Sequence, residues 1–137
     1  MIKISKATKK EALDNDWRQL IDTHYGYGLP WFEKYFRFKA VENEKLIGTI
    51  EGKCEPGAVY INALMTTESA RGRGIGTMLI KKAEEFGKKL GAHRSWLLAG
   101  KDWPANTFYK KLGFKLIGNL QDFFYHKDFV IYSRLIR

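Results

Sequence analysis

The sequence lacks the features that mark several large classes of protein. Cys54 is its single cysteine, which excludes an internal disulfide and a zinc site built from cysteines, and suits a reducing cytoplasm. No run of eighteen apolar residues is present, so we predict no membrane-spanning helix. The lysine-rich first ten residues are followed by no apolar stretch, so we expect no signal peptide. We therefore expect a cytoplasmic protein with no metal site, folded as a single domain over residues 1–137.

Acidic residues are scarce in the second half of the chain. Residues 1–70 carry ten basic and ten acidic side chains, whereas residues 71–137 carry fourteen and five, which accounts for the whole net charge of +9. A basic half indicates an anionic partner, either a nucleic acid or a multiply phosphorylated cofactor. A basic surface that contacts only solvent would have the same composition, so charge alone does not distinguish these three explanations, and sequence motifs are needed.

The first quarter of the chain predicts a strand and two short helical segments. Ile2 and Ile4 alternate with polar residues, which is typical of a strand. Thr8 and Glu11 have the spacing of a capping box, and the apolar residues that follow predict a helix ending near His24. Aromatic residues over 31–36 indicate a short second helix or an aromatic loop.

The remaining pattern predicts a mixed α/β fold. Residues 58–66 are almost wholly apolar or small, as in a central strand buried on both faces. This strand, the helix after it and the next strand form one parallel crossover unit. Turns are predicted at Asn43-Glu44 and at Pro56-Gly57. The further strands are expected over 37–42, 46–53, 95–99, 114–120 and 129–136, and the further helices over 75–90 and 106–112.

A glycine-rich turn stands between the buried strand and the long helix. It comprises Arg71, Gly72, Arg73, Gly74, Ile75 and Gly76. Glycines let the backbone turn tightly, and the free N–H groups at the start of the helix attract an anion such as a pyrophosphate. The glycine spacing and the absence of a carboxylate about twenty residues later disagree with a dinucleotide fingerprint, and no Lys-Ser/Thr pair follows as in a P-loop. A ligand-free glycine connection would explain the glycines but not the two arginines.

Two segments resemble motifs of the GNAT superfamily of N-acetyltransferases. Arg71-x-x-Gly74-x-Gly76 is similar to the pattern that binds the acyl-CoA pyrophosphate in that family. Residues 106–114, Asn-Thr-Phe-Tyr-Lys-Lys-Leu-Gly-Phe, look like its second coenzyme A segment. The resemblance covers 37–114 well. It implies a single-domain, mostly antiparallel mixed sheet of about seven strands with a central parallel βαβ unit splayed at the coenzyme A site, flanked by about four helices.

The resemblance also implies an activity and roles for individual residues. The chain would move an acetyl group from acetyl-CoA to a primary amine in a ternary complex, with Tyr109 as the general acid that protonates the leaving thiolate. Asn106 would bond the pantetheine arm, and an N–H near Met65 or Thr66 would stabilise the oxyanion. The residues expected at the cofactor are Leu64, Met65, Thr66, Arg71, Gly72, Arg73, Gly74, Ile75, Gly76, Thr77, Asn106, Tyr109 and Lys111.

The proton acceptor and the amine are less well defined. Some family members carry a glutamate thirteen residues before the motif arginine, where this chain has Ala58. A relayed proton could end at Glu51, Glu55, Asp102 or His24. Aromatic segments over 25–36 and 121–128 favour a small-molecule amine in a pocket that includes Tyr25, Trp31, Tyr60 and Asn62.

Other functions stay open at the level of the sequence. A protein N-terminal or lysine acetyltransferase would carry the same motifs. A coenzyme A-binding protein without turnover, or a nucleic-acid-binding module, would explain the basic half, although no nucleic-acid motif is present and we expect no nucleic-acid partner. Dimers are common among proteins of this family, so a homodimer is a further possibility.

Overall fold

The computed structural model describes residues 1–137. The chain forms two compact units, an N-terminal unit of residues Met1–Trp31 and a main unit of residues Phe32–Arg137. No helix in either unit is both long enough and apolar enough to span a bilayer.

The N-terminal unit contains one helix, α1 (Asp14–Tyr25). The turn at Thr8 does form, with its amide donating to the Glu11 carboxylate at 2.9 Å. The helix nevertheless begins six residues after Thr8, because Leu13 is not helical and Asp14 and Asp16 place their charges in the first turn, where the helix dipole favours them. The strand predicted at residues 2–4 is absent; two alternating residues without a partner strand do not make a stable strand.

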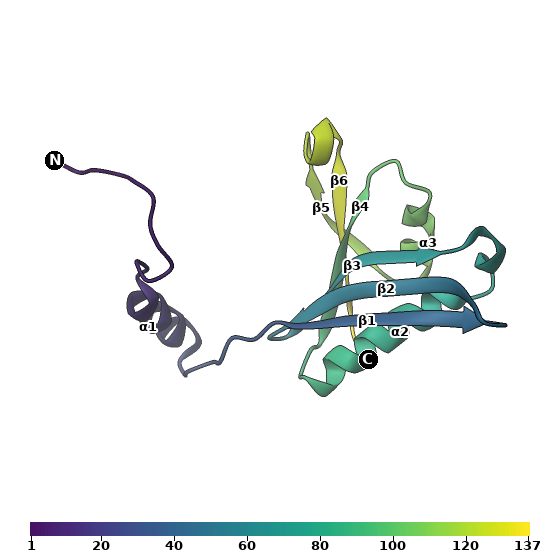
Figure 1. Ribbon diagram of the computed structural model, residues 1–137, viewed down its shortest axis with the longest axis horizontal. Coiled ribbons are helices and arrows are strands. Elements are labelled where there is room, and N and C mark those ends of the chain that lie inside the picture. The colour runs from purple at the N-terminus through teal and green to yellow at the C-terminus, as the bar shows by residue number, and fades with distance from the viewer. The chain divides into compact units, whose positions relative to one another are not determined.

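The main unit is built on a mixed six-stranded sheet of order β1-β2-β3-β4-β6-β5. All neighbouring strands are antiparallel except the β3–β4 pair, which is parallel. Figure 1 shows β1, β2 and β3 running together and β4, β5 and β6 turned away from them. The mixed, mostly antiparallel sheet with a central βαβ unit is therefore confirmed. The strands are β1 (Lys34–Glu42), β2 (Lys45–Glu55), β3 (Ala58–Thr66), β4 (Arg94–Gly100), β5 (Lys115–Leu120) and β6 (Phe129–Leu135).

The number of elements is smaller than the sequence suggested. There are six strands instead of about seven, because residues 2–4 form none. There are three α-helices instead of about four, because the aromatic segment 31–36 leads into β1 rather than into a helix. Phe36 is 6% exposed and Tyr35 is 72% exposed, which is the alternation of a strand. Two short 3₁₀ turns, η1 (Glu68–Ala70) and η2 (Phe124–His126), complete the structure.

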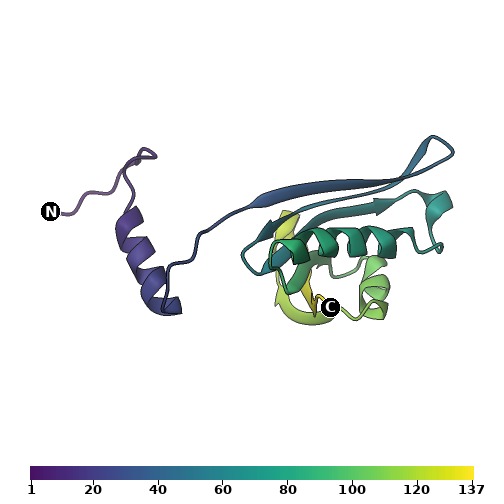
Figure 2. The ribbon, with the colours of Figure 1, turned by 90° about the horizontal axis from the view of Figure 1, so that it is seen from below.

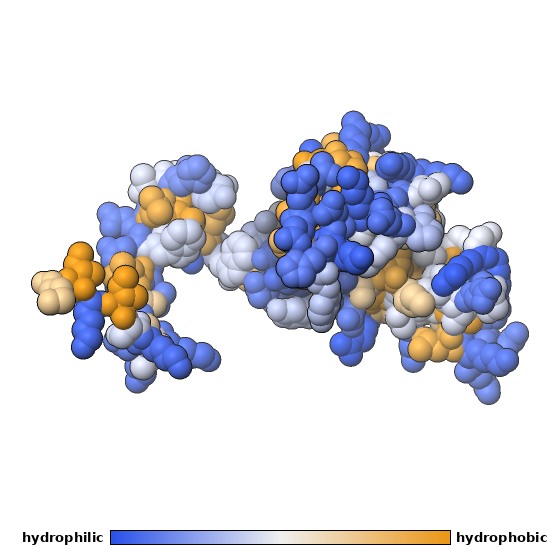
Figure 3. Space-filling model, turned by 90° about the horizontal axis from the view of Figure 1, so that it is seen from above, coloured by the Kyte–Doolittle hydropathy of each residue, from blue (hydrophilic) through white to orange (hydrophobic).

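The core of the main unit lies between the sheet and two helices. Figure 2 shows α2 (Ile75–Lys89) lying along one face of β1–β3. It packs Leu79, Ile80 and Ala83 against that face. The shorter helix α3 (Ala105–Lys111) contributes Tyr109, which packs in the core with Phe114 and Tyr132. Figure 3 shows that hydrophilic residues cover most of one side of the main unit, with small apolar patches between them.

Candidate active site

The centre of the sheet opens where β3 and β4 part. Their parallel pairing runs from Ala58 opposite Arg94 to Ile61 opposite Leu97 and then stops, whereas β3 continues to pair with β2 up to Thr66. A register shift against Glu51 and Gly52 leaves Asn62 as an extra residue in β3, which is a β-bulge. The edge of β3 that faces β4 therefore has no strand partner from residue 62 onward, and its backbone groups are free to bind a ligand.

This splay corrects the expectation that β3 is buried on both faces. Val59 and Ile61 are buried, but Asn62, Ala63 and Met65 are exposed. The bulge and the departure of β4 remove the neighbours that would have covered the second half of the strand. The predicted cofactor residues Leu64, Met65 and Thr66 lie on this open half.

The glycine-rich turn leads from β3 into the start of α2. Gly72 and Gly74 have φ values of 74° and 80°, in the left-handed region that residues with a Cβ rarely adopt. Gly74 caps the helix without any side-chain bond, and the backbone amides of Gly72 to Thr77 donate to no backbone carbonyl outside the helix. A row of free N–H groups at the positive end of a fifteen-residue helix is an anion site.

The two arginines of the turn have different surroundings. Arg71 is exposed and makes no ion pair. Arg73 is held by a bidentate contact with Glu42 at the end of β1, with Nη1 3.2 Å from Oε1. This arginine lowers the pKa of the Glu42 carboxyl, through a hydrogen bond and its charge. Glu42, which the sequence motifs did not indicate, therefore competes with any anion for Arg73.

Helix α3 lies beside the start of α2. A Cβ on Gly76 would come within 3.0 Å of the Phe108 ring, so the two helices approach closely at this point. The neighbouring Tyr109 is 9% exposed, and burial raises the pKa of its phenol. Its hydroxyl makes no hydrogen bond within the protein, but the oxygen is not fully enclosed, so solvent can reach it. A protonated phenol that solvent reaches can donate a proton to a bound group.

Asn106 is engaged inside the protein. Its amide nitrogen donates to the carbonyls of Gly100 and Trp103 at 2.9 and 2.6 Å. Its amide oxygen accepts a bond of 2.6 Å from the Tyr132 hydroxyl. These contacts fix the loop between β4 and α3 and join it to β6. To bind a cofactor, Asn106 would have to give up one of these hydrogen bonds.

A second opening lies next to the bulge, on the face of the sheet opposite α2. It is an open depression of about 410 Å³ lined by Tyr35, Arg37, Glu51, Tyr60 and Asn62, with Gly52 and Lys53. Arg37 and Glu51 are cross-strand partners whose Nε and Oε2 are 3.0 Å apart. The structure thus brings together Tyr60, Asn62 and Glu51, three of the residues named from the sequence. Arg37 was missed, since a charged residue on an alternating strand carries no distinguishing signal.

The other predicted residues lie elsewhere. Glu55 ends β2, away from the bulge, and lies 3.8 Å from Lys53. Asp102 is in the loop before α3, and Lys111 is exposed at the end of that helix. Tyr25, Trp31 and His24 belong to the N-terminal unit, and their roles stay predictions.

Comparisons with known proteins agree with this geometry. Residues 6–114 match the acetyltransferase (GNAT) family. A blasticidin-S acetyltransferase of Streptomyces morookaense is 28% identical over 96 residues, which cover 66% of this chain and 67% of that protein. An uncharacterised N-acetyltransferase of Methanocaldococcus jannaschii is 31% identical over 112 residues, 69% of this chain but half of that protein. The fold resembles a nourseothricin acetyltransferase, with TM-score 0.72, 21% identity and coverage of 76% and 66% of the two chains.

Proposed function

Because the chain belongs to the acetyltransferase (GNAT) family, whose members use acetyl-CoA as donor, we propose that it acetylates a primary amine on a small molecule. In this proposal residues 1–137 form one acyl-CoA N-acyltransferase domain. The relative from Streptomyces morookaense is named for the small molecule blasticidin S, which favours a small-molecule acceptor here over a protein N-terminus or lysine.

The observation that carries the proposal is the coincidence of an anion site with an open strand edge. The free amides of Gly72 to Thr77 lie at the start of α2, which follows the splayed half of β3 after the short turn η1. A coenzyme A molecule has both an anionic pyrophosphate and a pantetheine arm with amide groups. The helix start would hold the pyrophosphate, and the edge of Leu64 to Thr66 that faces away from β2 would bond the pantetheine arm. An N–H near Met65 or Thr66 would then stabilise charge on the thioester oxygen.

Tyr109 is the proposed general acid. When bound, acetyl-CoA supplies the acetyl thioester. The neutral amine nitrogen attacks the carbonyl carbon, a C–N bond forms and the C–S bond breaks. The departing sulfur takes the phenolic proton of Tyr109. Since burial raises the pKa of this phenol from its ordinary value near 10, the side chain is fully protonated at neutral pH and ready to donate.

The depression beside the bulge is the proposed acceptor pocket. Tyr35 and Tyr60 supply aromatic faces for an amine, and Asn62 supplies a polar group at the point where the strands part. Glu51 is the carboxylate of this pocket. Because Ala58 offers no carboxylate, Glu51 would take the proton that the amine loses, through a water molecule.

A thiol-release assay tests the proposal. Purified protein and acetyl-CoA are incubated with small amines, among them blasticidin S, and separately with peptides that have a free N-terminus. We expect turnover with at least one small amine and a kcat lower by about 10²–10⁴-fold in Tyr109→Phe. Because the Tyr109 hydroxyl makes no hydrogen bond within the protein, Tyr109→Phe should keep the wild-type circular dichroism spectrum, which serves as the folding control. Turnover with peptides alone would contradict the small-molecule assignment, and equal activity of Tyr109→Phe would contradict its role.

Glu51 is tested separately through the pH profile. Glu51→Gln should lower kcat/KM and abolish its rise on the acidic side, since a glutamine cannot accept the proton. Glu55→Gln, which changes a carboxylate on the same strand outside the pocket, should leave the profile unchanged. A wild-type profile for Glu51→Gln would show that another group is the base.

A further inference from the structure

A second depression of the main unit lies away from the proposed active site. It measures about 890 Å³ and runs between α2, the end of α3 and the strands β5 and β6. None of the residues predicted to hold the cofactor lines it. We call it the basic groove, after the side chains on its rim: Lys81, Lys88, Arg94, Lys115 and Arg137.

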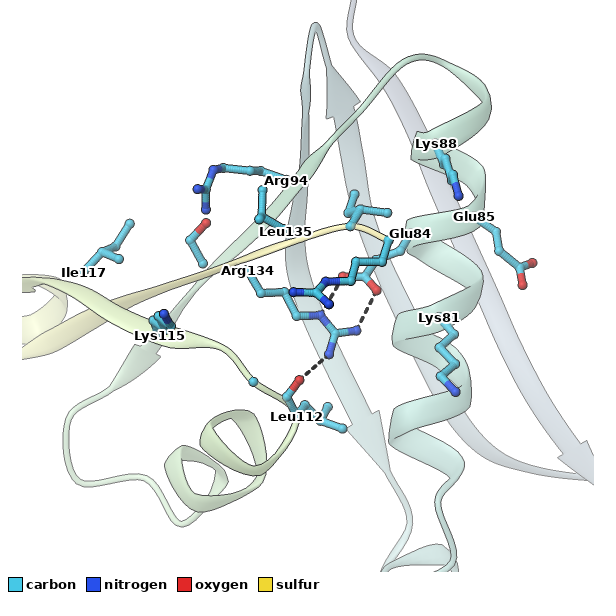
Figure 4. A pocket seen from close by; sticks show the side chains of 14 residues that line it. Lys81, Glu84, Glu85, Lys88, Arg94, Leu112, Lys115, Ile117, Arg134 and Leu135 are labelled. Carbon is cyan, nitrogen blue, oxygen red and sulfur yellow. Dashed lines mark hydrogen bonds and ion pairs between the residues drawn. The ribbon is translucent and has the colours of Figure 1, made fainter.

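The inner part of the basic groove is electrically balanced. Glu84 on α2 accepts bonds from Arg134 on β6, at 2.6 and 2.9 Å, and from the Ser95 hydroxyl at 2.6 Å. Arg134 also donates to the Leu112 carbonyl at 2.6 Å, as Figure 4 shows. This pair is satisfied internally and leaves no net charge for a ligand.

The rim of the groove is not balanced. Lys81 and Lys88 on α2, Arg94 on β4 and Lys115 on β5 are exposed, and none has an acidic side chain within 4 Å. Glu85 is the other acidic residue that lines the groove, and it lies 4.0 Å from Lys82. In Figure 4 its carboxylate points away from Arg94 and Lys115. The rim therefore carries uncompensated positive charge on both sides of the groove.

Between these cations the surface is aliphatic. Ile117 is 62% exposed and Leu135 is 51% exposed, and both line the groove together with Leu112 and Ile136. No aromatic residue lines it, so single-stranded nucleic acid would find no ring on which to stack. Charges with an aliphatic floor fit a ligand that is both acidic and apolar.

The spacing of the cations indicates the size of that ligand. Lys81 and Lys88 are seven residues apart on one helix, or about 10 Å along its axis, and Arg94 and Lys115 come from other elements. One phosphate or carboxylate cannot reach cations spread over this distance. An extended peptide, which advances about 3.3 Å per residue, can place successive carboxylates along it. We propose that the basic groove binds an acidic peptide segment of a partner protein, in which acidic and aliphatic residues alternate.

Fluorescence anisotropy with a labelled hexapeptide of alternating glutamate and leucine tests the proposal. We expect saturable binding to the full chain, at least tenfold weaker in Lys88→Glu/Arg94→Glu. The matched control, Lys82→Glu/Lys89→Glu, changes the same number of charges on residues that do not line the groove and should shift the Kd less than threefold. A peptide with glutamine in place of glutamate should bind at least tenfold more weakly.

Several results would overturn the inference. Equal weakening in both double variants would mean that the peptide senses only overall charge. Tighter binding of single-stranded RNA at the same groove would assign it to nucleic acid. A loss of self-association in Lys88→Glu/Arg94→Glu, without peptide binding by the wild type, would make it an interface between copies of this chain. Acetyl-CoA binding by these variants is expected to be unchanged, so failure here is distinguishable from failure of the proposed enzymatic function.

Discussion

Replacement of Glu84 by leucine should destabilise the main unit more than any change on the exposed face of α2. The Glu84 and Arg134 side chains are 9% and 17% exposed, and the carboxylate accepts three bonds from β4 and β6. Glu84→Leu leaves the largely buried Arg134 without its counter-charge and the Ser95 hydroxyl without its acceptor. Removal of one partner from a buried pair costs about 3–5 kcal/mol, and we expect a loss of that size in the free energy of unfolding.

Urea denaturation followed by circular dichroism measures this loss, because urea is uncharged and does not screen the ion pair. Glu85→Leu is the control next to it in sequence; its carboxylate is 67% exposed and lies 4.0 Å from Lys82, so its loss should cost at most about 1 kcal/mol. The double variant Glu84→Leu/Arg134→Met should be more stable than Glu84→Leu alone, since no buried charge is left unpaired. A cost below about 1 kcal/mol for Glu84→Leu would refute the reasoning.

Three further predictions follow from the same structure. Asn106→Ala leaves the buried Tyr132 hydroxyl without its acceptor and removes the side-chain bonds to the carbonyls of Gly100 and Trp103, which keep their backbone donors. It should cost about 1–3 kcal/mol in urea denaturation, whereas Asn119→Ala, at an exposed position, should cost less than about 0.5 kcal/mol; equal costs would contradict the structural role. Burial raises the pKa values of the Tyr109 and Tyr132 phenols above those in the unfolded chain. The two phenols therefore contribute fully to stability below pH about 10, and this contribution should be lost as the pH rises and tyrosines of the unfolded chain ionise. A melting temperature that stays constant from pH 9 to 11 would contradict this prediction. Glu42→Gln frees Arg73 from its ion pair and should tighten acetyl-CoA binding by about two- to fivefold, the worth of an exposed pair; weaker binding would show that Glu42 positions the arginine instead.

The sequence predicted those parts of the fold that depend on local periodicity. β3, α2 and the two hairpin turns lie where the patterns placed them, and Asn43 and Glu44 have the positive φ values of a tight hairpin turn. The conformation of segment 31–36 was harder to predict, because aromatic residues occur in helices, strands and loops alike. Phe36 belongs to β1 because it pairs with Gly52 of β2, a contact that the local sequence does not show.

Long-range contacts could not be predicted in the same way. Glu84 and Arg134 are fifty residues apart, and a glutamate on a helix usually indicates a solvent-facing position. The Asn106–Tyr132 bond likewise joins α3 to a strand twenty-six residues later. The bulge at Asn62 follows from the register of β2 against β3, which no property of the β3 sequence alone determines.

Where the predicted site is contiguous in sequence, its local conformation could be anticipated, while its role in binding stays a prediction. The glycine turn carries its chemistry within six residues, so its conformation and its free amides were accessible from sequence. The depression with Arg37 and Glu51 depends on the pairing of β1 with β2, so its composition became visible only in three dimensions.

The proposed function requires that the turn from Arg71 to Thr77 holds acetyl-CoA. Calorimetric titration of the purified chain with acetyl-CoA tests it most directly, with NAD as the comparison ligand and Arg71→Ala/Gly74→Ala as the variant. We expect saturable binding of acetyl-CoA but not of NAD, with binding lost in the variant while its circular dichroism spectrum is retained. A folded wild-type chain that does not bind acetyl-CoA, or a variant that binds it undiminished, would contradict the proposed function.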